Sequence, residues 1–88
     1  MNIEFTGKFE KQIDQIRDKK LKSEIANIVR AVIAAQTLAR VPNLKKLKGY
    51  KTAYRIRTGN YRIGIIIQNN VILFAAFADR KDIYKIFP

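Results

Sequence analysis

The sequence contains no cysteine and no histidine among its 88 residues. Disulfides, thiolate catalysis and zinc sites built on Cys or His are therefore excluded. A histidine general base is excluded as well, which removes the commonest proton-transfer group of hydrolases and nucleases. The sequence gives no indication of a cofactor or of a metal site.

Long hydrophobic runs are also lacking. The longest apolar segments, around Ile28 to Ala35 and Ile63 to Ile67, are far too short to span a bilayer. The N-terminus carries no basic region followed by an apolar run, so nothing indicates export. We therefore expect a cytoplasmic protein that does not associate with membranes.

Acidic residues are scarce: seven Asp and Glu face eighteen Lys and Arg, which gives a net charge of +11 and a pI near 10.3. Such an imbalance in a short chain favours a polyanionic partner, with nucleic acid or the ribosome ahead of an anionic membrane or an acidic protein. The alternative is a basic domain whose charge serves only solubility. The proportions of hydrophobic (48%) and charged (28%) residues indicate one globular domain over residues 1–88.

The first half of the chain has helical periodicity after a short strand. Residues 2–5 alternate apolar and polar side chains, and Thr6 offers an N-cap to a first helix. A second apolar stripe begins at Leu21 and predicts a helix to about Leu38, closed by Pro42. The two stripes consist of Phe9, Ile13 and Ile16, and of Leu21, Ile25, Ile28, Val29, Val32 and Ile33. An antiparallel pair of helices is expected.

The second half changes to strand periodicity. After a basic loop over 43–50, three strands are predicted at about 52–58, 61–68 and 71–78, separated by the dipeptides Gly59-Asn60 and Asn69-Asn70. These dipeptides suit type II′ and type I′ hairpin turns. The predicted fold is α+β in the order β-α-α-β-β-β, with the helical hairpin packed on one face of a mainly antiparallel, four-stranded sheet.

The first hairpin gathers arginines in the stretch YRIRTGNYRI, residues 54–63. With Gly59-Asn60 as the loop, Arg57 faces Arg62 and Arg55 faces Gly64, so all three arginines project from one face. Like charges directly opposite each other destabilise a sheet, a cost that an anion between them would offset. The alternative is that the arginines extend into water and only solubilise the sheet.

Counting on through the second turn pairs Arg62 with Phe77 and Gly64 with Ala75. The other face, which carries Tyr54, Ile56, Ile63, Ile65, Ile72, Phe74 and Ala76, is then the floor under the helices. The arginine face is predicted to be uncovered, with a shallow groove lined by the small residues in its middle.

The motifs from residue 44 to residue 84 resemble the RelE/ParE toxin superfamily. They are Leu47-Lys48-Gly49, Tyr54-Arg55-Ile56-Arg57, Gly59-Asn60-Tyr61-Arg62-Ile63 and Asp79-Arg80-Lys81-Asp82-Ile83-Tyr84. The resemblance covers the whole chain in element order, and the combination of motifs is more specific than any one of them.

The resemblance to the RelE-like branch implies a toxin that enters the ribosomal A site and cuts mRNA there, without a metal, leaving 2′,3′-cyclic phosphate or 3′-phosphate ends. It implies a cognate antitoxin, which the charge predicts to be acidic. By this resemblance the catalytic residues are Arg55, Arg57, Arg62, Arg80 and Tyr84. The lysines Lys45, Lys46, Lys48 and Lys51 are expected to bind ribosomal RNA.

Two departures from the superfamily concern proton transfer. Asp79 stands where many relatives have a histidine, and arginines replace the lysines of the first basic pair. Asp79 is expected to form a salt bridge with Arg80, and the general base is left open among Tyr84, a lysine and the ribosomal RNA. Tyr50, Tyr54 and Tyr61, with the phenylalanines Phe74, Phe77 and Phe87, are interpreted as packing residues.

Two alternative functions share the predicted fold. A ParE-like toxin would inhibit DNA gyrase by binding and would not need the full basic set. A catalytically inactive binding module of the same fold would act only through its antitoxin.

Overall fold

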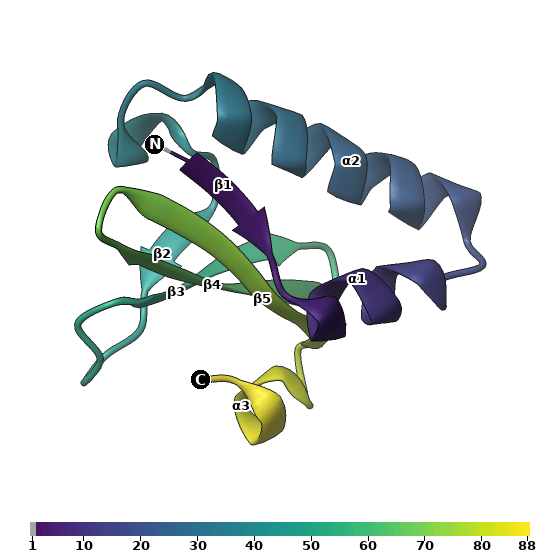
Figure 1. Ribbon diagram of the computed structural model, residues 1–88. Coiled ribbons are helices and arrows are strands. Elements are labelled where there is room, and N and C mark those ends of the chain that lie inside the picture. The colour runs from purple at the N-terminus through teal and green to yellow at the C-terminus, as the bar shows by residue number, and fades with distance from the viewer. Residues whose placement is uncertain (1) are drawn as a thin grey trace.

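The computed structural model describes residues 2–88, which form a five-stranded sheet between two layers of helix. The strand order is β1-β5-β4-β3-β2, with β1 parallel to β5 and the other neighbours antiparallel. Helices α1 and α2 cover one face and the short α3 lies on the other (Figure 1). The elements are β1 (Asn2–Phe5), α1 (Gly7–Asp14), α2 (Lys19–Ala34), the 3₁₀ turn η1 (Leu38–Arg40), β2 (Leu44–Lys46), β3 (Ala53–Thr58), β4 (Tyr61–Gln68), β5 (Val71–Asp79) and α3 (Ile83–Ile86).

The predicted fold class is confirmed, with two additions. The basic loop contains a fifth strand, because Leu44–Lys46 pairs along the outer edge of β3. The segment after β5 forms α3, which the apolar pattern did not predict because the helix has only four residues.

Side-chain caps fix where the two long helices begin. Thr6 Oγ1 accepts a hydrogen bond of 3.0 Å from the Phe9 N–H, as predicted. The Asp18 carboxylate does the same for α2 by accepting from the Lys20 and Leu21 N–H groups at 2.9 and 3.2 Å. Such caps satisfy backbone donors that have no partner inside the helix.

Helix α2 ends at Ala34, four residues before the predicted end at Leu38. Ala35 is extended, with a ψ of 128°, and the chain then turns through η1. This break allows Leu38 and the buried Val41 to pack against the core, whereas a straight helix would carry them past the sheet.

The hairpin between β3 and β4 has the predicted register, with Arg57 opposite Arg62 and Arg55 opposite Gly64. Both turns have the backbone that their sequences favour. Gly59 alone has a positive φ in the first turn (58°), as in type II′, whereas Asn69 and Asn70 both have one in the second (52° and 63°), as in type I′.

The predicted register between β4 and β5 is wrong beyond the middle of β5. Ile66 pairs with Leu73 as expected, but Gly64 pairs with Ala76, and Ala75 is the extra residue of a β-bulge. One inserted residue moves every later side chain to the opposite face. Arg62 consequently lies opposite Ala78 and not Phe77.

The N-cap residue of α1 and one side chain within α1 bond the backbone at this bulge. Thr6 Oγ1 donates to the Ala75 carbonyl at 3.1 Å, and Gln12 Oε1 accepts from the Phe77 N–H at 2.8 Å. Phe77 thereby joins the helix side of the sheet, in a core with Phe9, Ile25, Val32, Val41, Ile56, Ile63, Ile65, Ile72 and Phe74.

The arginine face of the sheet is not uncovered, contrary to the prediction. Ile83 of α3 and Phe87 are buried on it, against Ala53 and Ala76. The Phe87 ring occupies the place where a groove was expected, since a Cβ built on Gly64 would lie 2.5 Å from Phe87 Cγ. The sheet therefore has a second, smaller core under the C-terminal segment.

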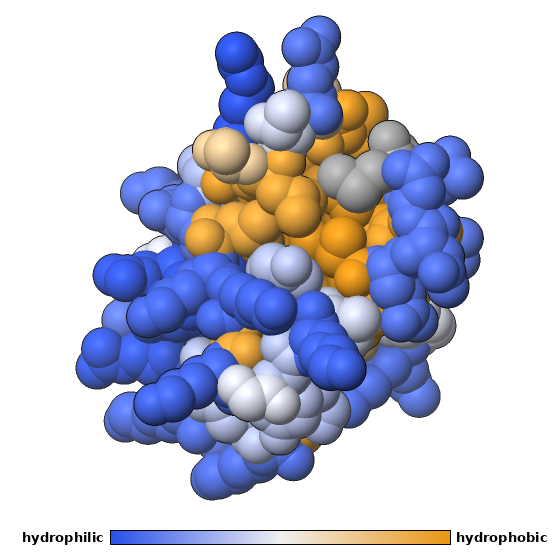
Figure 2. Space-filling model, turned by 90° about the vertical axis from the view of Figure 1, so that its left-hand side faces the viewer, coloured by the Kyte–Doolittle hydropathy of each residue, from blue (hydrophilic) through white to orange (hydrophobic). Residues whose placement is uncertain are grey.

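The surface on the left-hand side of the molecule, as Figure 1 shows it, combines hydrophobic and hydrophilic areas. A hydrophobic patch occupies the upper part of this view and hydrophilic side chains border it (Figure 2). Among residues 2–88, no helix is long and apolar enough to cross a membrane.

Candidate functional site

The β3–β4 hairpin places three predicted site residues together. Arg55, Arg57 and Arg62 share the α3 face of the sheet, next to the β3–β4 turn. Arg62 is half-buried, and its Nη1 donates to the Gly59 and Tyr61 carbonyls at 3.0 and 2.9 Å. Arg55 Nη1 donates to the Asn43 carbonyl at 3.2 Å. Each guanidinium has five N–H donors, so most of those on Arg55 and Arg62 remain for a ligand.

The turn after β5 supplies the other two predicted residues. The Arg80 N–H donates to the Asn60 carbonyl at 2.8 Å, which ties the turn to the β3–β4 hairpin. Helix α3 follows, with Ile83 fully buried and Tyr84 59% exposed. Burial of Ile83 holds the helix on the sheet, and the exposed Tyr84 side chain can contact a ligand.

Arg62 is the centre of the cluster. Partial burial lowers the pKa of Arg62, and the charges of Arg57 and Arg55 lower it further, with a smaller contribution from Arg80. Tyr84 lies close enough for its hydroxyl to act in the opposite direction. All five predicted residues are therefore brought together, and we refer to Arg55, Arg57, Arg62, Arg80 and Tyr84 as the arginine cluster.

The cluster is not neutralised by acidic side chains. Among residues 2–88 the single salt bridge joins Lys85 Nζ to Asp82 Oδ1 at 3.4 Å, so none of the four arginines takes part in one. Like charges gathered without a counterion favour the binding of an anion.

Comparison with known proteins assigns the chain to a family. The sequence model of the family described as "ParE toxin of type II toxin-antitoxin system, parDE" matches residues 3–84. The chain belongs to the RelE/ParE superfamily of toxins.

Relatives of this RelE/ParE-type toxin include RelE proteins. Toxin RelE3 of Methanocaldococcus jannaschii is 52% identical over 46 residues, a match that spans 52% of each chain and thus about half the length of that relative. A RelB-RelE antitoxin-toxin complex from Methanococcus jannaschii contains a chain that is 34% identical, with a TM-score of 0.80, 97% of this chain and 99% of that chain being covered.

A more distant structure has the same fold. The archaeal RelE-RelB complex from Pyrococcus horikoshii matches with a TM-score of 0.72 at 17% identity, over 90% of this chain and 93% of that chain. At this identity the likeness concerns the fold alone.

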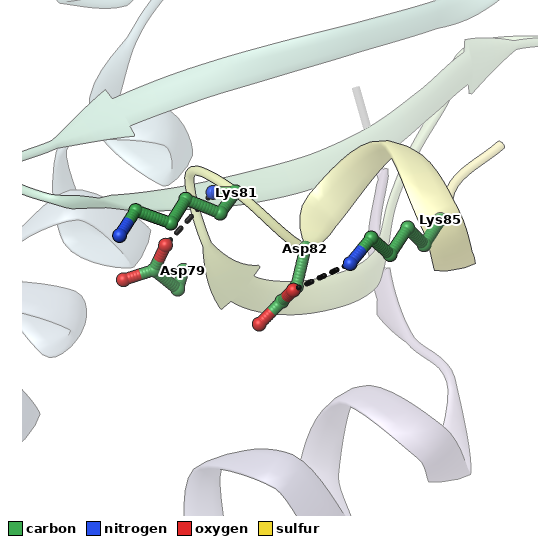
Figure 3. A network of polar contacts seen from close by, with 4 residues as sticks. All are labelled: Asp79, Lys81, Asp82 and Lys85. Carbon is green, nitrogen blue, oxygen red and sulfur yellow. Dashed lines mark hydrogen bonds and ion pairs between the residues drawn. The ribbon is translucent and has the colours of Figure 1, made fainter.

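The predicted salt bridge between Asp79 and Arg80 is wrong. Asp79 Oδ1 accepts a hydrogen bond of 2.8 Å from the Lys81 N–H (Figure 3). The Asp79 carbonyl accepts one of 2.9 Å from the Asp82 N–H. An Asp side chain commonly bonds the backbone two residues further on at such turns. In this RelE/ParE-type toxin Asp79 thus stabilises the turn that leads into α3.

Three of the four predicted lysines lie around a cavity of about 450 Å³ beside the cluster. Lys45, Lys46 and Lys48 line it together with Arg55 and Tyr84, whereas Lys51 is exposed outside its lining. Lys45 pairs directly with Arg55 across β2 and β3, which extends the positive charge to the edge of the sheet.

The interpretation of Tyr50 as a packing residue is wrong, and its place in the cavity lining was not predicted. Tyr54 and Tyr61 pack against the helix-side core as interpreted, and the Tyr61 ring stacks on Phe77 at a centroid distance of 5.2 Å. Tyr50 is instead 52% exposed and lines the cavity. Its place after Lys48-Gly49 in a basic segment is the only sequence signal that separates it from the other two.

Proposed function

We propose that this toxin is a RelE-like endoribonuclease that cuts mRNA in the A site of the ribosome, in the cytoplasm. The observation that carries the proposal is the arginine cluster: three guanidinium groups and one exposed tyrosine lie around Arg62, without an acidic partner. The fork of guanidinium donors matches the geometry of a phosphate, to which it binds through two parallel hydrogen bonds.

The cluster suits cleavage by the 2′-hydroxyl of the substrate. The 2′-oxygen forms a bond to the adjacent phosphorus while the bond from phosphorus to the 5′-oxygen breaks, which yields a 2′,3′-cyclic phosphate and a 5′-hydroxyl. The 2′-hydroxyl loses a proton and the leaving 5′-oxygen gains one. Preorganised cations lower the barrier because negative charge accumulates on the phosphoryl oxygens in the transition state.

Within the cluster we assign charge stabilisation to Arg55, Arg57 and Arg62. Two hydrogen bonds from Arg62 Nη1, to the Gly59 and Tyr61 carbonyls, hold its guanidinium in place for this role. Arginine stays protonated in proteins, so none of the arginines serves as the base. Asp79 is engaged by the Lys81 N–H, which leaves the Tyr84 hydroxyl, a lysine such as Lys48 and the ribosomal RNA as candidates for the base.

An acidic antitoxin is the second partner that we propose. It is supported by the charge of +11 and by the RelB antitoxin in the crystal structure of the 34% identical relative from Methanococcus jannaschii. The hydrophobic patch with its hydrophilic border suits an amphipathic segment (Figure 2). The net charge of +11 favours an acidic one. The prediction fails if the neighbouring reading frame encodes no small acidic protein, or if the two proteins do not co-purify.

Inhibition of DNA gyrase is the alternative function, favoured by the description of the family model that matches residues 3–84. A gyrase inhibitor works by binding and needs no group that neutralises a reacting phosphate. The presence of all five residues of the arginine cluster is the reason to prefer the nuclease.

Controlled expression in cells, with primer extension on a translated message, tests the proposal. The nuclease produces cuts at codons in the A site, and these cuts disappear with Arg62→Ala and with Tyr84→Phe. DNA damage in cells whose mRNA stays intact would contradict the nuclease and favour inhibition of DNA gyrase. An absence of any toxicity would indicate an inactive binding module.

A further inference from the structure

The cavity beside the arginine cluster contains more than positive charge. Its volume of about 450 Å³ falls within the range of roughly 300–1,000 Å³ that is typical of small-ligand sites. Tyr50 and Tyr84 contribute aromatic rings, and Phe87 and Pro88 contribute apolar surface. The remaining lining, Leu47 apart, is basic.

Tyr50 is held by a fixed turn. The Leu47 carbonyl accepts from the Tyr50 N–H at 3.2 Å, and Gly49 between them has a φ of 86°, as the third residue of a type II turn requires. The Leu47 N–H donates to the Ala53 carbonyl at 2.9 Å, and its side chain packs against the core under α3. The ring of Tyr50 is thus presented from an anchored segment.

Exposure of this ring has no structural benefit within the described chain. An aromatic side chain contributes to stability mainly by burial, as Tyr54 and Tyr61 do in the helix-side core. Tyr50 and Tyr84 are 52% and 59% exposed, and both line the same cavity. Exposed aromatic rings surrounded by cations are the features with which proteins hold unpaired bases.

We propose that this cavity is a subsite for one unpaired RNA base next to the cleaved phosphate, with Tyr50 as the residue on which the base stacks. Tyr84 and Arg55 belong to both the cavity and the arginine cluster, which places the base and the phosphate side by side. Lys45, Lys46 and Lys48 then neutralise the phosphates that flank this base. The inference rests on the proposed function, because it assumes that the cluster binds RNA.

The lining favours RNA over an acidic peptide as the occupant. A carboxylate-rich peptide needs cations, but it gains little from a flat aromatic ring. A base gains about 1–3 kcal/mol from stacking on an aromatic side chain, whatever its identity. The structure therefore makes Tyr50 a determinant of how the substrate is positioned.

Binding of a short fluorescent single-stranded RNA, measured by anisotropy without ribosomes, tests the subsite. The RNA carries 2′-O-methyl groups so that it cannot be cut. Tyr50→Leu is expected to weaken binding about 5- to 150-fold, whereas Tyr50→Phe, which keeps the ring, stays within about twofold of the wild type. Phe5→Leu is the matched control, since Phe5 is also exposed (41%) but does not line the cavity.

Two further measurements separate stacking from a general loss of structure or charge. A set of RNAs is used in which each carries one abasic position at a different place along the strand. One of them should bind the wild type as weakly as intact RNA binds Tyr50→Leu. The affinity of Tyr50→Leu for that abasic RNA should be no lower than its affinity for intact RNA. The slope of log K against log salt should be unchanged in Tyr50→Leu and about 0.7 smaller in Lys48→Gln.

The subsite is overturned if Tyr50→Leu binds intact RNA as the wild type does. It is also overturned if Tyr50→Leu weakens only the complex with the acidic antitoxin, which would make the cavity a peptide site. If binding depends on Tyr50 but the wild type never cuts ribosome-bound mRNA, the subsite stands and the proposed function fails.

Discussion

At the scale of single residues, the arginine cluster places like charges close together at a cost in stability. Arg57 lies directly opposite Arg62, a position in which like charges are unfavourable. The lowered pKa of Arg62 reports the same effect, since burial and the neighbouring cations disfavour its charged form in the folded chain. A binding site for an anion accounts for an arrangement that stability alone would not favour.

Replacing Arg57 by Gln should therefore stabilise the protein. Relief of the cross-strand repulsion is expected to raise the free energy of unfolding by about 0.2–1 kcal/mol, measured by urea denaturation. The gain should shrink as salt is added, because these charges are largely exposed. It should not vary with pH near neutrality, since a lowered arginine pKa disfavours folding at every pH below it.

Lys51→Gln is the control for this measurement. Lys51 carries the same charge and is exposed, but it lies outside the cavity lining. If both variants gain equally, the effect comes from the total charge and not from the pairing of Arg57 with Arg62. Mutation of Arg57 should also lower the rate of mRNA cleavage, whereas Lys51→Gln should change it much less.

At the scale of elements, the β-bulge decides which residues form each core. It moves Phe77 to the side of α1 and α2 and leaves small alanines under α3. The bulge is held from α1, because Gln12 Oε1 accepts from the Phe77 N–H at 2.8 Å. The first helix thereby influences the face that carries the arginine cluster, although it lies on the other side of the sheet.

Gln12→Leu should destabilise the protein by about 1–3 kcal/mol, because the partly buried Phe77 N–H loses its acceptor. A shift of that size corresponds to a fall of several degrees in the melting temperature of a chain this short. Gln12→Glu keeps an oxygen at the same distance and should stay close to the wild type. Equal melting temperatures for Leu and Glu at this position would contradict a role of Gln12 in holding the bulge.

Gly64 and Phe87 form the contact that seats α3. A Cβ on Gly64 would come within 2.5 Å of Phe87 Cγ, and the Phe87 ring is buried and cannot turn away without disturbing the core under α3. Gly64→Ala is expected to cost about 1–3 kcal/mol, the usual range for overpacking a core. It should also increase hydrogen exchange at the Phe87 N–H, which donates to the Ile83 carbonyl at 2.8 Å.

A double-mutant cycle with Phe87→Ala distinguishes this contact from a general effect of the alanine. In the double variant the added methyl group points into the space left by the ring. The loss of stability in the double variant should therefore be smaller than the sum of the losses in the two single variants. Additive costs would show that Gly64 is not required by Phe87.

The sequence predicted the elements better than their final register. The caps, the hairpin turns and the alternation of β3 and β4 are local patterns, so the pairing of Arg55 and Arg57 with β4 followed from Gly59-Asn60 alone. The bulge at Ala75 could not be predicted, because it depends on hydrogen bonds from Thr6 and Gln12, more than 60 residues away. Helix α3 is too short to have a periodic pattern, so it was not predicted. The Phe87 ring over Gly64 and the cavity beside Tyr50 both depend on the segment that contains α3, so they were not predicted either.

At the scale of the whole molecule, eleven excess positive charges repel one another in an 88-residue chain. A ligand that binds only the folded state stabilises it. Phosphate should therefore raise the melting temperature more than chloride at equal ionic strength. If phosphate binds at the arginine cluster, the difference between the rises in melting temperature in phosphate and in chloride should be smaller in Arg62→Ala. An equal response of the wild type and this variant would place the phosphate elsewhere.

Cleavage by purified protein on ribosomes that hold a defined codon in the A site is the most direct test of the proposed function. The wild type is expected to cut the mRNA within that codon and to leave a 2′,3′-cyclic phosphate, while Arg62→Lys, which keeps the charge but not the forked donors, cuts far more slowly. Intact mRNA after incubation with folded wild-type protein would contradict the account, as would cleavage at the same rate by Arg62→Ala.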